Sequence, residues 1–238
     1  MTATRTLTAA EINAALLYRD ALILVLNKPS GIAVHVTAHD KISLDQSFHH
    51  LQFGLPKKPE LAHRLDRGTS GCLVLGRHRQ ALIKLGKLFE KQRVNKTYRA
   101  ICVGVPAEPQ GIITRAILKS GVGSKWKMSL DDAGQAAVTE YRVLRTLGAL
   151  SEIEFSPKTG RTHQIRLHAA FALGCPVVGD PFYGPADGEF SVSNVPMMLH
   201  AETVEIPLQQ SKPSIIVHAP LPEHMVELLA QMAICQES

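Results

Sequence analysis

Hydrophobic and polar residues follow a helical spacing in some stretches of the chain and a strand-like spacing in others. Residues 80–91 carry apolar side chains three and four positions apart, which predicts an amphipathic helix. Thr8 and Glu11 form a capping-box pattern, and further helices are expected at 8–17, 162–173 and 222–235. Short apolar or alternating runs predict strands at residues 21–26, 72–75, 97–105, 112–118, 136–144, 150–155, 198–206 and 214–217.

The predicted strands come in runs with few helices between them, not in regular strand–helix–strand alternation. This order favours an α+β fold with a mixed, mostly antiparallel sheet flanked by helices. Residues 121–132 separate two predicted strands and are expected to form a hairpin tip or flexible loop that carries Trp126. A chain of 238 residues is long enough to bury a substantial core and is most simply one domain.

Composition and charge narrow the function classes only slightly. The net charge of +5 and the pI near 9.1 suit a polyanionic partner, although many basic proteins bind no nucleic acid. The four cysteines are far apart in the sequence, so we expect buried free thiols and neither a zinc ribbon nor a disulfide framework. The chain shows no signal peptide and no apolar run long enough to span a bilayer, which predicts a cytoplasmic location.

The most unusual segment, residues 63–71, reads HRLDRGTSG. Arg64 and Arg67 flank Asp66, and nearby cations favour the ionised form of a carboxyl group. An ionised carboxylate on a tight loop can act as a nucleophile or a base. The alternative is a structural ion pair followed by a turn, which the spacing alone favours.

A second candidate segment, residues 159–168, is rich in cations at the expected start of a helix. A glycine before the helix would leave backbone N–H groups available to an anion. Arg161, His163 and Arg166 add donors for a phosphate or a carboxylate. The alternative is an amphipathic helix with solvated cations.

Lys96 and Tyr98 form a third candidate, because alternate residues of a strand point to one face. The tyrosine could stack on an unpaired base while the lysine binds a phosphate. The alternative is an ordinary packed tyrosine beside an edge lysine.

Other chemistries find little support in the sequence. The chain contains no nucleophile elbow, no Walker loop and no complete dinucleotide-binding glycine pattern, and its histidines lack metal-ligand spacing. We therefore predict no metal. A glycosidase would need paired carboxylates, but Asp131, Asp132 and Asp180 fit surface or turn roles better.

Taken together, these segments resemble the RluA family of RNA pseudouridine synthases. The resemblance rests on ordered blocks that cover about residues 20–219, and the ordered set is far more specific than any one block. The blocks are residues 27–31, 63–71, 96–98, 160–168, 174–180, 183–184 and 198–201.

The resemblance implies an α+β catalytic domain at 20–238 behind an N-terminal extension at 1–19, with an active cleft across the middle of its sheet. It implies an isomerase that converts uridine in ribosomal RNA, transfer RNA or both to pseudouridine without a cofactor. Asp66 matches the catalytic aspartate, Tyr98 the residue that stacks on the target uracil, and Arg166 the arginine that pairs with the catalytic carboxylate. Arg64 matches a residue that helps to hold the RNA with the target base flipped out. The other residues expected to contact RNA are members of the same blocks: Lys28, Lys96, Arg161 and His163.

Two further expectations follow from this resemblance. Only 26 residues precede Asn27, too few for the S4 RNA-binding domain of many relatives, so the catalytic domain is expected to find its RNA alone. A monomer is expected, because the sequence shows no obvious exposed apolar stripe. A non-catalytic RNA-binding or ribosome-assembly factor on the same fold is the alternative, but such a factor would have no need of Asp66, Tyr98 and Arg166 together. A glycoside hydrolase would require a second acid that the sequence does not offer.

Overall fold

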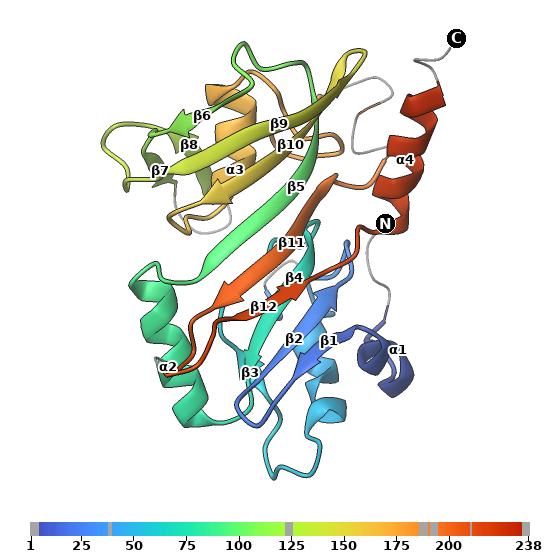
Figure 1. The fold of residues 1–238 in the computed structure, drawn as a ribbon, viewed down its shortest axis with the longest axis vertical. Coiled ribbons are helices and arrows are strands. Elements are labelled where there is room, and N and C mark those ends of the chain that lie inside the picture. The colour runs from blue at the N-terminus through green and yellow to red at the C-terminus, as the bar shows by residue number, and fades with distance from the viewer. Residues whose placement is uncertain are drawn as a thin grey trace. The chain divides into compact units, whose positions relative to one another are not determined.

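The computed structural model describes residues 5–37, 40–121, 126–185, 190, 195–209 and 211–234. The chain forms two compact units, and each contains strands and helices (Figure 1). Unit 1 comprises Met1–Lys96 and His200–Pro222, and unit 2 comprises Thr97–Leu199 and Glu223–Ser238.

Unit 1 contains a mixed sheet in the order β1-β2-β4-β11, with β12 paired to β11 and β3 paired to β4. The β4–β11 pair is parallel, and the other pairs in this unit are antiparallel. The strands are β1 (Leu16–Arg19), β2 (Ile23–Lys28), β3 (Glu60–Leu61), β4 (Ser70–Gly76), β11 (Leu199–Ile206) and β12 (Ile215–His218). The helical elements are α1 (Ala9–Ala14), the 3-10 helix η1 (Leu44–Leu51) and α2 (Arg79–Glu90).

The core of unit 1 forms around β4, every residue of which is buried. Strand residues such as Val25, Val74 and Val204 pack together with Leu85 of α2, because the apolar face of that amphipathic helix lies against the sheet. The predicted capping box at Thr8 and Glu11 is confirmed, and α1 packs on η1.

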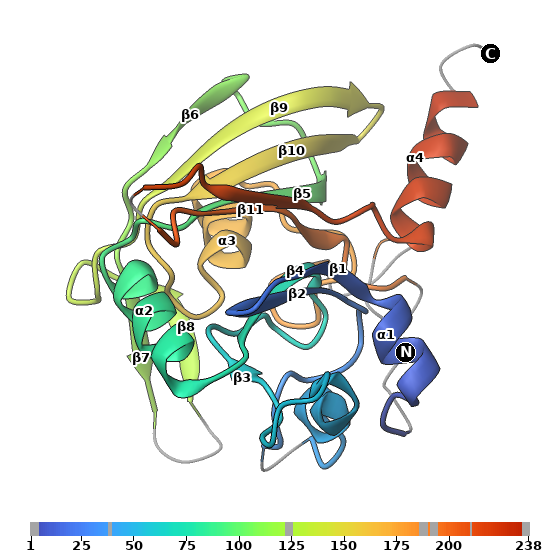
Figure 2. The ribbon, with the colours of Figure 1, turned by 60° about the horizontal axis from the view of Figure 1, so that its bottom comes forward.

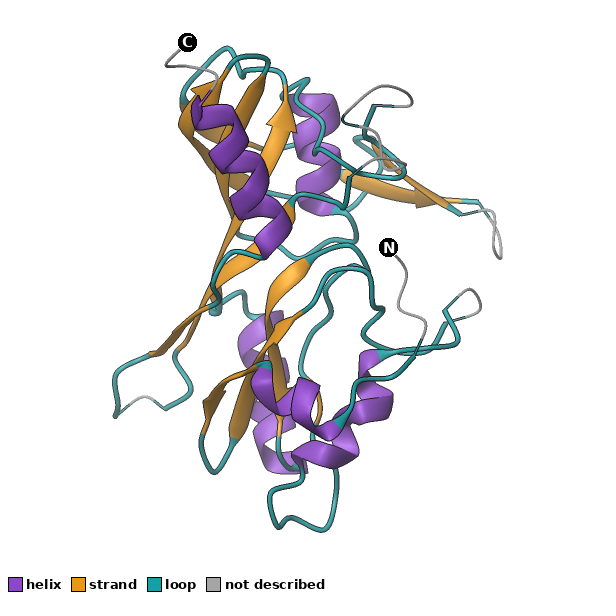
Figure 3. Cartoon of the chain, turned by 90° about the vertical axis from the view of Figure 1, so that its right-hand side faces the viewer, coloured by secondary structure: helices purple, strands orange, loops and turns teal. Residues whose placement is uncertain are grey.

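Unit 2 contains an antiparallel sheet in the order β5-β10-β9-β6 and a separate hairpin of β7 and β8. Its strands are β5 (Asn95–Val103), β6 (Gln110–Ile113), β7 (Ile117–Ser120), β8 (Lys127–Leu130), β9 (Thr139–Leu147) and β10 (Leu150–Pro157). The helices are α3 (Gln164–Leu167), the π-helical turn η3 (His168–Ala172) and α4 (Glu223–Ile234). Figure 2 shows α3 beside this sheet, and Figure 3 distinguishes the helices from the strands by colour.

The predicted α+β class and the mixed, mostly antiparallel pairing are confirmed. Cys72, Cys102 and Cys175 are buried free thiols, as expected, whereas Cys235 lies outside the described residues. Among helices in the described part of the chain, none has both the length and the apolarity that crossing a membrane requires.

Three predicted boundaries are wrong for local reasons. The first helix ends at Ala14 and not at 17, because Leu16 begins the strand that pairs with β2. The predicted strand 112–118 is two strands, β6 and β7, which belong to different sheets. The helix predicted at 162–173 has His163, with a left-handed φ of 57°, as its N-cap in place of Thr162. Gly174 does adopt the expected left-handed conformation.

Gly71 permits the close approach of β4 and β11, and replacing it tests this packing. A Cβ at Gly71 would lie 2.2 Å from the carbonyl oxygen of Ala201, and the residue has φ +102°. We expect Gly71→Ala to lower the free energy of unfolding by about 3 kcal/mol or more, since backbone strain and overpacking add together. Gly86→Ala, in α2 with open space around the Cβ, is the matched control and should not destabilise the protein. Equal urea midpoints for both variants would contradict this packing.

Candidate functional site

Backbone contacts fix the loop that carries Asp66 to the turn at residues 27–31. The Gly31 N–H donates to the Arg67 carbonyl oxygen at 2.9 Å, and the Ser30 hydroxyl donates to the Gly68 carbonyl oxygen at 2.6 Å. Within the loop, the Thr69 N–H donates to the Asp66 carbonyl oxygen at 3.1 Å, which closes a tight turn. The main chain around Asp66 is therefore held by a segment almost 40 residues earlier in the sequence.

Lys28 supplies the central contact of this arrangement. Its side chain is fully buried, and its ammonium group donates to the carbonyl oxygens of Pro29 and Ile32, both at 2.8 Å, and of Arg67 at 3.1 Å. Burial lowers the pKa of Lys28 to about 7, and the nearby negative charge of Asp66 opposes this shift. The sequence predicted that Lys28 contacts RNA. The contacts observed for its ammonium group are with protein carbonyl groups.

The other end of the loop is fixed by a buried Ser–His pair. The Ser70 hydroxyl lies 2.8 Å from Nδ1 of His200, and Nε2 of His200 lies 3.2 Å from the carbonyl oxygen of Ala219. Both Ser70 and His200 are almost fully buried. Asp66 thus lies between two anchored segments, and its own side chain is half-buried.

The cations beside Asp66 in the sequence are exposed. Arg64 and Arg67 both face solvent, and Arg67 forms an ion pair with Asp40 at 3.0 Å. The partner in this ion pair, Asp40, lies outside the segment 63–71. Arg64 keeps the exposure that an RNA contact requires.

His63 anchors the loop on the side that precedes Asp66. Its Nε2 accepts a hydrogen bond from the Val74 N–H at 3.0 Å, and its ring stacks on Phe89 with the centroids 4.8 Å apart. Burial of the ring lowers the pKa of His63 to about 3, and the positive charge of Lys96 lowers it further. The imidazole is therefore neutral at physiological pH and serves as an acceptor.

In unit 2, Arg166 forms a buried, two-pronged ion pair with Asp180. Its Nε and one Nη atom each donate to a different carboxylate oxygen at 2.7 Å, and the two side chains are 4% and 1% exposed. Asp180 also accepts the backbone N–H groups of Phe182 at 2.9 Å and Tyr183 at 3.2 Å. The sequence predicted a turn role or a surface position for Asp180. The turn role is confirmed, and the surface position is wrong because the side chain is buried.

A buried network of polar side chains sets the start of α3. Gln164 accepts from the Thr159 hydroxyl at 2.7 Å and the Arg161 N–H at 3.0 Å, and its amide nitrogen donates to the Thr139 hydroxyl at 2.9 Å. His168 Nδ1 lies 2.8 Å from the same Thr139 hydroxyl. The Arg161 N–H, one of the backbone groups expected to be available to an anion, therefore donates to a protein side chain.

The other predicted residues occupy partly exposed positions. Tyr98 lies on β5 opposite the fully buried Phe155 of β10, so its backbone is part of a rigid sheet. Lys96 precedes it by two residues in the same strand, and burial lowers the pKa of Lys96. Arg161 donates to the carbonyl oxygen of Ala136 at 3.1 Å, and His163 Nδ1 lies 2.8 Å from the Tyr183 hydroxyl.

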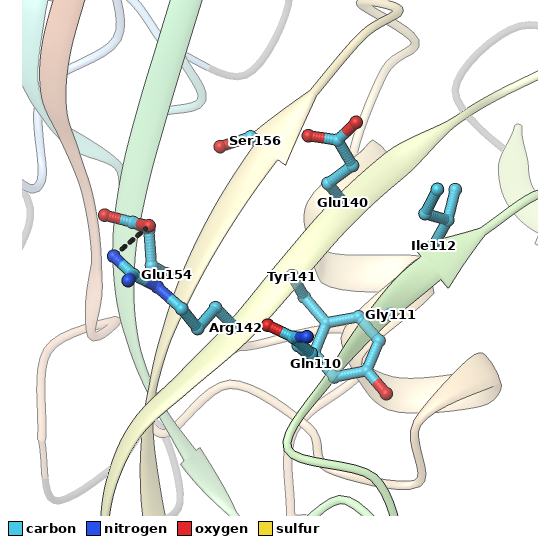
Figure 4. Close-up of a pocket in the computed structure, with 8 residues that line it drawn as sticks. All are labelled: Gln110, Gly111, Ile112, Glu140, Tyr141, Arg142, Glu154 and Ser156. Carbon is cyan, nitrogen blue, oxygen red and sulfur yellow. Dashed lines mark hydrogen bonds and ion pairs between the residues drawn. The ribbon is translucent and has the colours of Figure 1, made fainter.

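A shallow pocket of about 430 Å³ lies on the sheet of unit 2 (Figure 4). Its lining includes Glu140 and Glu154, and Glu154 pairs with Arg142 at 3.0 Å. Carboxylates disfavour a phosphate backbone, and the pocket contains no residue that the sequence singled out. The residues that line it are Gln110, Gly111, Ile112, Glu140, Tyr141, Arg142, Glu154 and Ser156.

Comparison with known proteins gives consistent matches. The family model described as RNA pseudouridylate synthase matches residues 22–171. An uncharacterised RNA pseudouridine synthase of Zymomonas mobilis is 42% identical over 213 residues, which cover 89% of this chain and 95% of that protein. Ribosomal large subunit pseudouridine synthase D of Borreliella burgdorferi is 36% identical over 205 residues, and the match spans 83% of this chain and 62% of that protein.

Solved structures give the same result. The human protein RNA pseudouridylate synthase domain containing 4 superimposes with a TM-score of 0.79 at 26% identity, and the match covers 94% of this chain and 95% of the human chain. A second human protein, RNA pseudouridylate synthase domain containing 1, gives a TM-score of 0.71 at 27% identity, with 92% and 94% covered.

The neutral state of His63 predicts a specific pH dependence of stability. As the pH falls from about 6.5 towards 3, the unfolded chain binds a proton at this histidine before the native state does, so stability is lost. We expect His63→Gln, which keeps an acceptor for the Val74 N–H, to reduce this loss in urea unfolding between pH 7 and 4. His49→Gln, at an exposed histidine of the same unit, is the control. An identical pH slope for His63→Gln and the wild type would refute the assignment.

The buried Arg166–Asp180 pair predicts a large cost for removing one partner. Asp180→Ala would leave an uncompensated buried guanidinium and should lower the free energy of unfolding by about 3–5 kcal/mol. Glu154→Ala breaks the more exposed pair with Arg142 in the same unit and should cost less than about 1 kcal/mol. Comparable losses in denaturant unfolding would show that the Asp180 pair is not buried as described.

Proposed function

This chain belongs to the RNA pseudouridylate synthase family of isomerases, and we propose that it converts uridine in ribosomal RNA to pseudouridine with Asp66 as the catalytic carboxylate. One observation carries the proposal: Asp66 is half-buried on a loop whose main chain is held at both ends by buried polar groups. Catalysis needs a reactive group whose position is fixed before the substrate binds. Relatives named for the ribosomal large subunit support ribosomal RNA as the substrate.

The reaction breaks the N1–C1′ glycosidic bond, turns the uracil and joins C5 to C1′. The hydrogen on C5 leaves as a proton and N1 takes up a proton, so substrate and product are isomers. The reaction needs no net oxidation or reduction. The nucleotide must first leave the base stack, at a cost of a few kcal/mol. Stacking on an aromatic ring can offset about 1–3 kcal/mol of that cost. We assign this stacking to Tyr98, which is partly exposed on a rigid strand.

Arg166 takes the part of the arginine that keeps the catalytic carboxylate ionised. Two N–H groups of the guanidinium donate to Asp180, and this pair orients the side chain. Arg64, exposed two residues before Asp66, is assigned to the RNA that surrounds the extruded base.

Replacing Asp66 tests the proposed chemistry directly. Asp66→Asn keeps the size of the side chain but removes its charge, and we expect tritium release from RNA that contains 5-tritiated uridine to fall by about 10³-fold or more. RNA binding, measured by filter retention, should stay within about threefold of the wild type, since the proposed binding groups are unchanged.

Asp132→Asn, at an exposed aspartate of unit 2, is the matched control and should release tritium at the wild-type rate. Normal turnover by Asp66→Asn would reject the catalytic role. Absence of tritium release by the wild type on total ribosomal RNA that lacks the modification would reject the proposed substrate, and transfer RNA is then the next substrate to assay.

A further inference from the structure

Aromatic side chains gather around His163 in unit 2. The His163 ring centroid lies 5.8 Å from those of Trp126 and Phe182 and 5.6 Å from that of Tyr183. Phe171 extends the group, with its centroid 5.9 Å from that of Tyr183. We call these five side chains the aromatic patch.

The patch exposes more apolar ring surface than packing alone would explain. Phe182 is 71% exposed, Phe171 60% and Trp126 38%. Isolated exposed hydrophobic residues are ordinary, but several exposed aromatic rings in one place indicate a binding surface. Neither Trp126 nor Phe182 has a part in the chemistry assigned to Asp66.

Cations accompany the rings. The Lys119 ammonium lies 5.1 Å from the Trp126 ring centroid, and the Arg166 guanidinium carbon lies 5.1 Å from the Tyr183 centroid and 5.5 Å from the Phe182 centroid. Rings interleaved with positive charge suit a ligand with flat bases and phosphates, which is an unpaired stretch of nucleic acid. The net charge of +5 agrees with such a ligand.

The backbone beneath the patch is fixed. Asp180 accepts the N–H groups of Phe182 and Tyr183 while it is itself held by Arg166, and the Tyr183 hydroxyl lies 2.8 Å from His163 Nδ1. Phe182 is therefore exposed on an ordered turn, so a stacked base would order little more of the backbone.

We propose that the aromatic patch binds an unpaired nucleotide of the RNA substrate, other than the target uridine, by stacking on Phe182 and Trp126 with Lys119 near a phosphate. The proposal rests on the proposed RNA substrate. It extends recognition to a single-stranded part of the substrate, and it predicts tolerance of base identity, because every base presents a stacking face.

The protein provides its own reporter for this test, because Trp126 is the only tryptophan in the chain. Tryptophan emission of the full-length protein is titrated with a 12-nucleotide single-stranded RNA, a 12-base-pair RNA duplex and heparin, at one salt concentration. We expect saturable quenching by the single strand and little change with the duplex or heparin. Unchanged emission at a concentration of the single strand that saturates binding by fluorescence anisotropy would overturn the proposal, as would equal quenching by heparin.

Ring removal gives a second, independent test. Phe182→Ala should weaken binding of a fluorescein-labelled single strand by about 5- to 20-fold, the loss expected for one stacked base, and Phe182→Trp should restore it. Binding of the duplex should change less than about twofold. The control is Ile112→Ala, which truncates another well-exposed apolar side chain, on β6 of the same unit, and should leave both affinities unchanged.

The outcomes separate this proposal from the proposed function. If the wild type releases tritium but Phe182→Ala binds the single strand as tightly as the wild type, the aromatic patch is not an RNA site and the isomerase assignment stands. If the single strand quenches Trp126 but no tritium is released from any RNA, the patch stands as a binding surface and the catalytic assignment fails.

Discussion

The buried ammonium of Lys28 is the contact on which the arrangement of unit 1 depends. Its three carbonyl acceptors belong to the turn at 27–31, to the next residue along and to Arg67, which directly follows Asp66. An ammonium group that has left water loses its hydration, so each carbonyl must stay in place to stabilise it. The turn and the loop consequently behave as one unit, and the backbone of Asp66 is positioned by a contact that involves no substrate.

Unit 2 also depends on a buried cation, but here the cation is held by a carboxylate and not by backbone carbonyl groups. Asp180 binds the guanidinium of Arg166 with both oxygens and also accepts two backbone N–H groups of the following turn. One buried carboxylate thereby orients a cation assigned to the chemistry and supports the turn that exposes Phe182. Functional groups held by packed, hydrogen-bonded supports need little reorganisation when a ligand binds.

The sequence was most informative where residue types are unusual for their position. An aspartate between two arginines before a Gly-Thr-Ser turn stood out, and the runs of predicted strands with few helices between them correctly predicted the α+β class. Lys28 was expected to contact RNA because it lies in a block that resembles the family, and the sequence did not reveal that its acceptors include a carbonyl group 39 residues away. Such partners are set by tertiary pairing, which local spacing does not encode.

The error at residues 112–118 has a related cause. A mostly apolar run with only Thr114 and Arg115 in its middle does not show where a chain leaves one sheet and enters another, as it does between β6 and β7. The buried pair of Arg166 and Asp180 was also missed, since the two residues are 14 positions apart and Asp180, between Gly179 and Pro181, has the sequence context of a simple turn.

Pseudouridine mapping tests the central claim, that the Asp66 carboxylate isomerises uridine in ribosomal RNA, most directly in the cell. Ribosomal RNA from cells that lack this gene is compared, nucleotide by nucleotide, with RNA from the same cells complemented by the wild type or by Asp66→Asn. The account predicts at least one pseudouridine that disappears in the absence of the gene, returns with the wild type and does not return with the variant. A site restored equally by both proteins would contradict it.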